Sequence, residues 1–213
     1  SHLASLETVL GRLQTAGLKL KLSKCEFLKS RIRFLGHEVD AQGIHTQSDK
    51  IDAVSKFPEP TTVDQVRSFL GLSGYYRPFI RNYSAIASPL NQLLRKGATF
   101  HWDAPQRKSF EDLKLALTTT PVLKFPDYQK PFTLYTDASQ SGLGAVLMQP
   151  DSRGKLGAIA YASRSLNKAE GNYSVTHLES LAIVWALKKF RDLIYGYPIT
   201  VYTDHLPVTY LFK

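Results

Sequence analysis

Two short stretches, FTLYTD at residues 132–137 and ITVYTD at residues 199–204, decide the fold of this chain. Both alternate apolar and polar residues, as half-buried β-strands do, so each tyrosine shares a face with the aspartate two residues later, Asp137 or Asp204. If the strands are parallel neighbours, both aspartates stand at the carboxyl end of the sheet, where open α/β sheets place their functional sites. The repeated pattern therefore predicts two carboxylates side by side.

A third acid lies in an otherwise apolar stretch. Glu179 belongs to LESLAIVWALKKFR (residues 178–191), where the spacing predicts a long helix capped by Ser174 or Thr176 and reaching about Leu193. A helix packed on the sheet could turn this carboxylate toward the two aspartates. Three acids without a basic partner repel one another, and a divalent cation such as Mg²⁺, which prefers oxygen ligands, removes that conflict. Taken alone, each acid is more often a solvated residue at the end of an element.

The surrounding pattern predicts a mixed sheet. Strands are expected at residues 131–137, 143–149, 159–162 and 199–204, with a turn at Gln140-Ser141-Gly142 between the first two. Three sequential strands, a helix and another strand indicate that the helix provides a right-handed crossover.

Upstream of residue 120 the periodicity is mostly helical. Short apolar stretches flank Asp40-Ala41-Gln42-Gly43 and predict a β-hairpin over residues 32–45. Thr62 and Gln65 form a candidate capping box. Helices are expected at residues 3–16, 48–57, 63–72, 75–82, 85–96 and 103–119. The change of period near residue 120 indicates a boundary between structural units.

Composition and charge limit the classes of protein to which this chain can belong. The chain has 213 residues, 43% of them hydrophobic, and carries 27 Lys and Arg against 18 Asp and Glu, a net charge of +9. That balance makes a polyanionic partner a serious alternative. Cys25 is the single cysteine, so an internal disulfide and a cysteine-cluster metal site are excluded. The longest apolar run, residues 181–187, is too short to span a membrane, so we expect no membrane partner and an unsecreted, soluble chain.

Several long motifs resemble one family. The motifs YTDAS (135–139), GLGAVLMQ (142–149), AYASRSLNKAEGNYS (160–174), LESLAIVWALKKFR (178–191) and VYTDH (201–205) are similar to the ribonuclease H domain of gypsy-type long-terminal-repeat retrotransposon polymerases. The upstream motifs KLSKCEFLKSRIRFLGHEVDAQGI (21–44), VRSFLGLSGYYRPFIRNYSAIASPL (66–90) and FEDLKLALTTTPVL (110–123) look like the palm end, thumb and connection of the same Pol polyprotein.

The resemblance implies an architecture. We expect an α+β N-terminal part, made of a β-hairpin and a helical thumb, followed by an α/β ribonuclease H-like mixed sheet that is C-terminally truncated. Residues 1–46 would be the end of the palm, residues 47–120 the thumb and connection, and residues 121–213 the partial ribonuclease H-like domain.

The resemblance also implies an activity. By position, Asp137, Glu179 and Asp204 match three metal-binding carboxylates of the ribonuclease H site. In that family they hold Mg²⁺, or alternatively Mn²⁺, and water attacks the RNA strand of an RNA–DNA hybrid. Two such ions can activate the water and stabilise the leaving oxygen. The expected partners are an RNA–DNA hybrid or a template–primer duplex.

The resemblance and the mixture of aromatic and basic residues suggest further nucleic-acid contacts. The expected contact residues are Phe34, Leu35, Gly36, His37, Arg67, Arg77, Arg81, Asn172 and Thr176. The first four match the primer grip of the family, and the alternative is an ordinary hairpin packed by Phe34 and Leu35 with Gly36 as a bulge. Aromatics at helical spacing usually form core, so Phe69, Leu72, Tyr76, Phe79 and Ile80 are expected to pack while the arginines face a phosphate backbone.

Two departures from the family pattern leave two functional hypotheses. The first is that the paired aspartates of the polymerase motif are absent, so DNA polymerisation by this chain alone is excluded. The second is that only nine residues follow Asp204 and none is an acid, so the fourth carboxylate of the family's ribonuclease H site is missing. We therefore weigh a ribonuclease H fragment, weakly active or inactive alone and completed by the rest of Pol or by another chain, against a non-catalytic nucleic-acid-binding or assembly module. Family analogy suggests cytoplasmic particles or the nucleus as its location.

Overall fold

The computed structural model describes residues 2–210 and divides into two compact units, residues 1–32 and 33–213. The first unit contains helix α1 (His2–Thr15) and the 3₁₀ turn η1 (Leu22–Lys24), and strand β1 (Arg31–Phe34) begins in it. Helix α1 ends as predicted because Gly17 takes a positive φ of 70° and the Leu18 amide donates back to the Leu13 carbonyl.

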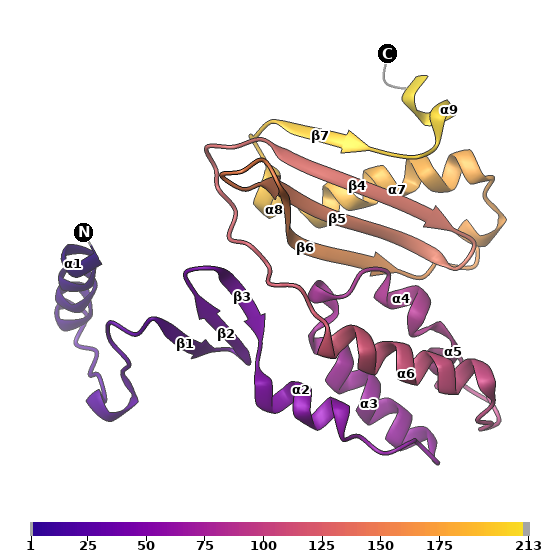
Figure 1. Cartoon of the computed structure of the whole chain (residues 1–213), viewed down its shortest axis with the longest axis horizontal. Coiled ribbons are helices and arrows are strands. Elements are labelled where there is room, and N and C mark those ends of the chain that lie inside the picture. Colours follow the sequence, from indigo (N-terminus) through magenta and orange to yellow (C-terminus); the bar gives the residue numbers. More distant parts are fainter. Residues whose placement is uncertain (1, 211–213) are drawn as a thin grey trace. The chain divides into compact units, whose positions relative to one another are not determined.

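The second unit is the larger body in Figure 1 and holds most of the chain. Its elements are the hairpin strands β2 (His37–Asp40) and β3 (Gly43–Thr46); the helical elements α2 (Ser48–Ser55), α3 (Val63–Tyr75), η2 (Arg77–Phe79), α4 (Tyr83–Ile86), α5 (Ser88–Gln92) and α6 (Ala104–Thr118); the strands β4 (Phe132–Ser139), β5 (Gly142–Pro150) and β6 (Leu156–Arg164); and then η3 (Glu170–Asn172), α7 (Val175–Lys189), α8 (Arg191–Ile194), β7 (Ile199–Tyr202) and α9 (Leu206–Thr209).

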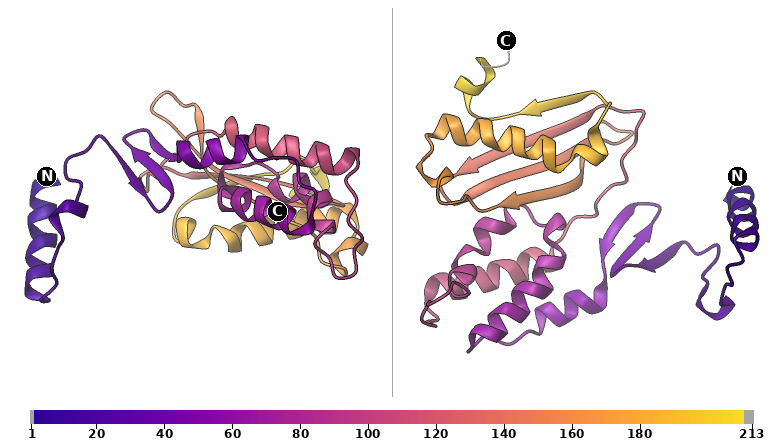
Figure 2. Two further views of the ribbon diagram at one scale, coloured as in Figure 1. Left: turned by 90° about the horizontal axis from the view of Figure 1, so that it is seen from below. Right: turned by 180° about the vertical axis from the view of Figure 1, so that it is seen from behind.

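The main sheet has the predicted mixed topology. Its strand order is β6-β5-β4-β7, with β4 antiparallel to β5, β5 antiparallel to β6, and β4 parallel to β7. The crossover from β6 to β7 runs through α7, which lies along one face of the sheet (Figure 2). The expected strand at residues 199–204 is shorter than predicted, since β7 ends at Tyr202. An α+β chain with a ribonuclease H-like sheet is the observed fold class.

Two cores lie on opposite faces of the sheet because successive side chains of a strand point to opposite sides. Phe132 and Leu134 of β4 pack with Ala186, Phe190 and Ile194 of the α7–α8 region in one core. The other core joins the helices α2 to α6 to the sheet; its members include Val66, Phe69, Tyr76, Phe79, Ile80, Leu90, Leu113, Val146 and Ala158, and Leu72 packs against it. The predicted packing role of the aromatics on α3 and η2 is thus confirmed.

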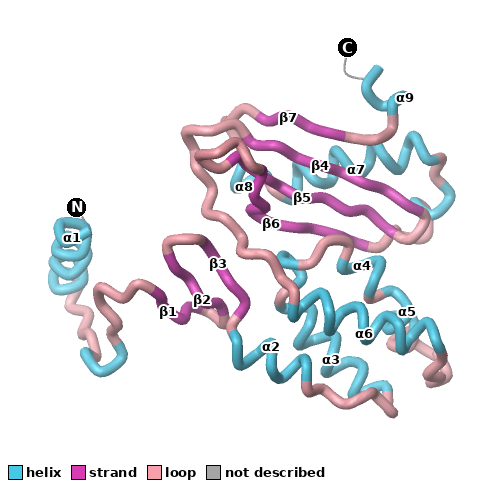
Figure 3. The backbone as a smooth tube through the Cα atoms, viewed as in Figure 1, coloured by secondary structure: helices cyan, strands magenta, loops and turns pink. Residues whose placement is uncertain are grey.

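The helical region between residues 75 and 96 differs from the prediction. Helix α3 continues to Tyr75, and only the 3₁₀ turn η2 follows where a helix over 75–82 is expected. Asn82 then takes a left-handed conformation with φ of 53°, and Pro89 opens α5 as a separate short helix (Figure 3). Proline and a left-handed residue both interrupt helical hydrogen bonding, so the expected helix over 85–96 becomes α4 and α5. No helix among residues 2–210 is long and apolar enough to cross a membrane.

Substitution Gly43→Ala is expected to lower the free energy of unfolding by about 3 kcal/mol. Gly43 has φ of 144°, and a Cβ there would collide with the carbonyl oxygen of Leu123, to which the neighbouring Ile44 amide donates at 2.8 Å. Chemical denaturation measures the loss. Gly71→Ala is the matched control, because nothing lies within 4 Å of its Cβ position in the middle of α3, and a gain of about 0.5–1 kcal/mol is expected there. Equal stability of the two variants would contradict the steric argument.

Candidate metal and nucleic-acid site

The parallel pairing of β4 and β7 brings the two YTD stretches to one end of the sheet. Tyr135 is in register with Tyr202, and their rings stack with centroids 4.9 Å apart. Asp137, near the end of β4, and Asp204, just beyond β7, follow these tyrosines by two residues. Both aspartates are exposed, and neither accepts a hydrogen bond from any residue in the range 2–210 that the structure describes.

Glu179 is the buried member of the predicted trio. It lies on α7, whose N-cap Ser174 accepts a hydrogen bond from the His177 amide, and its side chain is 4% exposed. The Ala138 amide donates to its Oε1 at 3.3 Å, whereas Oε2 is buried and has no hydrogen-bond partner among residues 2–210. Burial raises the pKa of Glu179, and the charges of Asp204 and Asp137 raise it further, against the lowering effect of the Ala138 hydrogen bond. The charges of both aspartates therefore act on Glu179.

The trio does not form a closed cage. Tyr135, two residues before Asp137, packs against the helical core, whereas α7 covers the opposite face of the sheet, so Asp137 and Glu179 approach the end of β4 from different sides. Among the residues that the structure describes, no three Asp, Glu, His or Cys side chains are close enough together to hold a metal ion. The three carboxylates are near enough at the end of the sheet for their charges to interact, but they are not arranged to coordinate one ion together.

One contact ties the start of α7 to the residue after Asp204. Thr176 Oγ1 and His205 Nε2 lie 3.0 Å apart, which holds the Asp204 segment beside the helix that carries Glu179. Asn172, in η3, is exposed. The sequence does not reveal His205 as a positioning residue, because nothing in its spacing indicates which side chain it contacts.

The hairpin turn at residues 34–37 presents apolar side chains to solvent. Leu35 and Gly36 both have positive φ, 46° and 71°, as a two-residue turn between twisted strands requires. The side chains of Phe34 and Leu35 are 59% and 72% exposed, so the alternative of a hairpin packed by these two residues is wrong. Gly36 belongs to the turn and is not a bulge in a strand.

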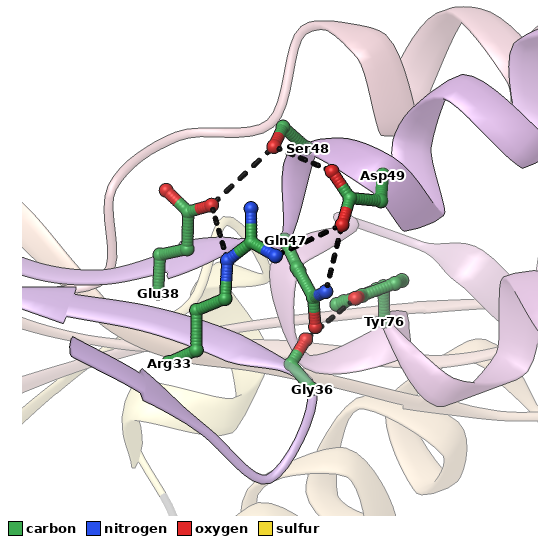
Figure 4. Close-up of polar contacts among 7 residues, drawn as sticks. All are labelled: Arg33, Gly36, Glu38, Gln47, Ser48, Asp49 and Tyr76. Carbon is green, nitrogen blue, oxygen red and sulfur yellow. Dashed lines mark hydrogen bonds and ion pairs between the residues drawn. The ribbon is translucent and has the colours of Figure 1, made fainter.

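Aromatic residues at the end of α3 hold this turn. Tyr76 donates to the Gly36 carbonyl at 2.6 Å, as Figure 4 shows, and the Tyr75 hydroxyl donates to the Leu35 carbonyl. The His37 ring stacks on Tyr75 and Phe79 at 5.3 Å and 5.5 Å, and burial lowers the pKa of His37. A neutral His37 packed among aromatics has a structural role in fixing the turn. The sequence does not reveal these contacts, because the partners lie 40 residues apart.

The three predicted arginines have different environments. Arg67 forms an exposed ion pair with Asp64 one turn away. Arg77 donates through Nη2 to the Ser163 carbonyl at 2.8 Å and to Ser84 Oγ at 3.3 Å, so it fastens η2 to β6. Arg81 is exposed and has no hydrogen bond or ion pair with any residue in the range 2–210.

Comparison with known proteins is consistent with this geometry. Residues 102–201 match the family described as the RNase H-like domain found in reverse transcriptase. The chain is 42% identical to the retrovirus-related Pol polyprotein from transposon opus and 43% identical to that from transposon 297, both of Drosophila melanogaster. Each alignment covers 99% of this chain but only 22% and 20% of the relatives, so the chain spans about a fifth of their length.

Solved structures agree with the sequence relatives. The foamy viral protease-reverse transcriptase in complex with RNA/DNA hybrid matches 99% of this chain and 28% of its own, with a TM-score of 0.81 and 28% identity. Its complex with dsDNA matches with a TM-score of 0.80 over 100% of this chain and 44% of its own. Residues 102–201 thus belong to the RNase H-like domains found in reverse transcriptases, and the whole chain corresponds to a segment of the retrovirus-related Pol polyproteins of gypsy-type retrotransposons.

Proposed function

We propose that this chain binds an RNA–DNA hybrid and that Asp137, Glu179 and Asp204 hold a divalent cation, Mg²⁺ or Mn²⁺, for hydrolysis of the RNA strand. The observation that carries the proposal is the buried Oε2 of Glu179, which has no hydrogen-bond partner and lies within the electrostatic influence of both aspartates. A buried acceptor without a donor is costly unless a cation or a proton satisfies it.

The donor chemistry of the three residues suits a hard cation. Three carboxylates supply only oxygen donors, which suit Mg²⁺, and the bound ion would activate water and stabilise the leaving oxygen. The Ala138 amide holds one Glu179 oxygen at 3.3 Å and leaves the other available. Asp137 and Asp204 are exposed and form no hydrogen bonds within residues 2–210, so their side chains can rotate toward a common ligand.

Nucleic acid as the partner has independent support. The net charge of +9 favours a polyanion, and solved structures similar to this chain are complexes with RNA/DNA hybrid and with dsDNA. The exposed turn formed by Phe34 and Leu35 offers an apolar surface that could contact bases or sugars. We assign it, together with Asn172 and Thr176, to hybrid contact.

A cleavage assay tests the proposal. Hybrids labelled on the RNA strand or on the DNA strand, and a dsDNA of the same sequence, would be incubated with the chain in Mg²⁺ and in EDTA. We expect the hybrid to be bound and its RNA strand alone to be cut, weakly, in Mg²⁺ but not in EDTA. Cleavage that persists in EDTA, equal cleavage of the DNA strand, or absence of hybrid binding would each overturn the proposal.

A second candidate is a non-catalytic module that binds nucleic acid or assembles with other parts of Pol. It is favoured by the observation that no three acidic, histidine or cysteine side chains of the described chain are positioned to hold a metal. Strand β7 forms one edge of the sheet and could pair with a strand from another segment or chain. Hybrid binding without cleavage, even in Mg²⁺ or Mn²⁺, would support this candidate.

A further inference from the structure

A short segment of the helical region borders the carboxylate site. Arg81 and Asn82, between η2 and α4, line a small cavity of about 30 Å³ together with Asp137 and Gly144. A second cavity of about 30 Å³ places Asn82 beside Asp137 again, on the side of Ser139. Asp137 is therefore flanked by residues that lie more than fifty positions earlier in the sequence.

Several contacts fix this segment against the sheet. Arg77 donates to the Ser163 carbonyl at 2.8 Å, and the Ser84 amide donates to Ser163 Oγ at 2.9 Å, so both sides of the segment are attached to β6. Gly144 pairs with Asp137 across β4 and β5, and a Cβ at Gly144 would collide with Asn82 Oδ1. The absence of a side chain at Gly144 leaves room for the Asn82 side chain in its present position.

The charge of Arg81 has no partner within the described chain. Its side chain is exposed, and no hydrogen bond or ion pair with residues 2–210 engages its guanidinium, in contrast to Arg67 and Arg77. Its positive charge also opposes the rise in the pKa of Tyr161 that burial causes, which places the guanidinium near the same face of the sheet. An arginine left free beside a carboxylate is well suited to an anion that the carboxylate alone would repel.

We propose that Arg81 binds a backbone phosphate of the nucleic-acid strand that crosses Asp137, so that the helical region completes the binding site of the sheet. Asn82 positions Arg81 through its left-handed turn and its contact with Gly144. The guanidinium offers two parallel N–H donors to one phosphate, which a lysine cannot match. This inference rests on the proposed binding of an RNA–DNA hybrid.

Hybrid affinity and its salt dependence test the role of Arg81. Binding would be measured in EDTA, so that the hybrid stays intact, over a range of KCl concentrations. For Arg81→Ala we expect about tenfold weaker binding and a log–log salt slope smaller in magnitude by about one. Arg81→Lys should keep the slope and recover part of the affinity, because the charge remains and the paired donors are lost. Arg107→Ala is the matched control, since Arg107 is also exposed but already paired with Glu59 at 2.7 Å.

Neutral methylphosphonate linkages locate the contact. Each hybrid in a series would carry a single such linkage at a different position along either strand. At one position the linkage should weaken binding by the wild-type chain and have no effect on binding by Arg81→Ala. If Arg81→Ala keeps the affinity and slope of Arg107→Ala while the wild type binds and cuts the hybrid, the role of Arg81 is overturned and the proposed function stands. If the wild type does not bind the hybrid, both are overturned.

Discussion

Replacing Glu179 by glutamine is expected to lower metal-dependent cleavage of the hybrid by about 100- to 1000-fold and, at the same time, to stabilise the fold at neutral pH. The amide oxygen of glutamine can still accept the Ala138 hydrogen bond, but the variant carries no charge to bury beside Asp137 and Asp204. Loss of function together with a gain in stability is typical of a residue kept for chemistry.

The pH dependence of stability follows from the direction of the pKa shift. The pKa of Glu179 is raised from its ordinary value of 4.5, so the folded state keeps the proton to higher pH than the unfolded state. The favourable contribution of protonated Glu179 to the free energy of unfolding is fully present below about pH 4.5. It is lost as the pH rises through the raised pKa. Denaturation curves of the wild type and Glu179→Gln should therefore converge toward pH 4 and diverge toward pH 7.

Two comparisons separate this effect from a general perturbation. Asp137→Asn, at an exposed position, should lose cleavage to a similar extent while its stability changes by less than about 0.5 kcal/mol. Adding Mg²⁺ should raise the melting temperature of the wild type more than that of Glu179→Gln, because a ligand that binds the folded state stabilises it. A Glu179→Gln variant less stable than the wild type at pH 7 would show that the buried charge is already satisfied.

Replacing Phe69 by alanine is expected to lower the free energy of unfolding by about 3–5 kcal/mol. Phe69 is 0% exposed, and its ring lies 4.5 Å from that of Phe110 and 5.4 Å from that of Phe57. Truncation of the Phe69 side chain leaves a cavity in this core. The surrounding helices cannot all move inward to fill it, because the same core also contains Val146 and Ala158 of the sheet.

Urea denaturation measures this loss, and hydrogen exchange shows how far it extends. Because the core joins helices to strands, amide protection in β5 should fall together with that in α3. Phe34→Ala makes the same change at a position that is 59% exposed, so its stability should stay within about 0.5 kcal/mol of the wild type. A Phe69→Ala variant that loses protection in α3 alone would show that the helices and the sheet unfold separately.

Helix caps depend on residues that are close together in the sequence, and the sequence predicts where such helices begin. The Thr62 cap is observed, since its hydroxyl accepts the Gln65 amide at 3.3 Å, and α6 begins after the Asp103 capping box. The prediction fails where proline and Asn82 interrupt a run of helical periodicity, because periodicity of side chains does not report the backbone conformation of a single residue.

Residue patterns along the chain are enough to predict the strand that carries Asp137, the strand that precedes Asp204, the helix that carries Glu179, and the mixed topology that brings these acids to one end of a sheet. The face from which each acid approaches, and the distant residues that surround it, depend on how the helices pack on the sheet. Strand periodicity fixes the relative faces of residues within one strand, but the side on which a helix packs is set by long-range burial. For the same reason Arg81, far from Asp137 in sequence, is found beside it only after the helices and the sheet share a core.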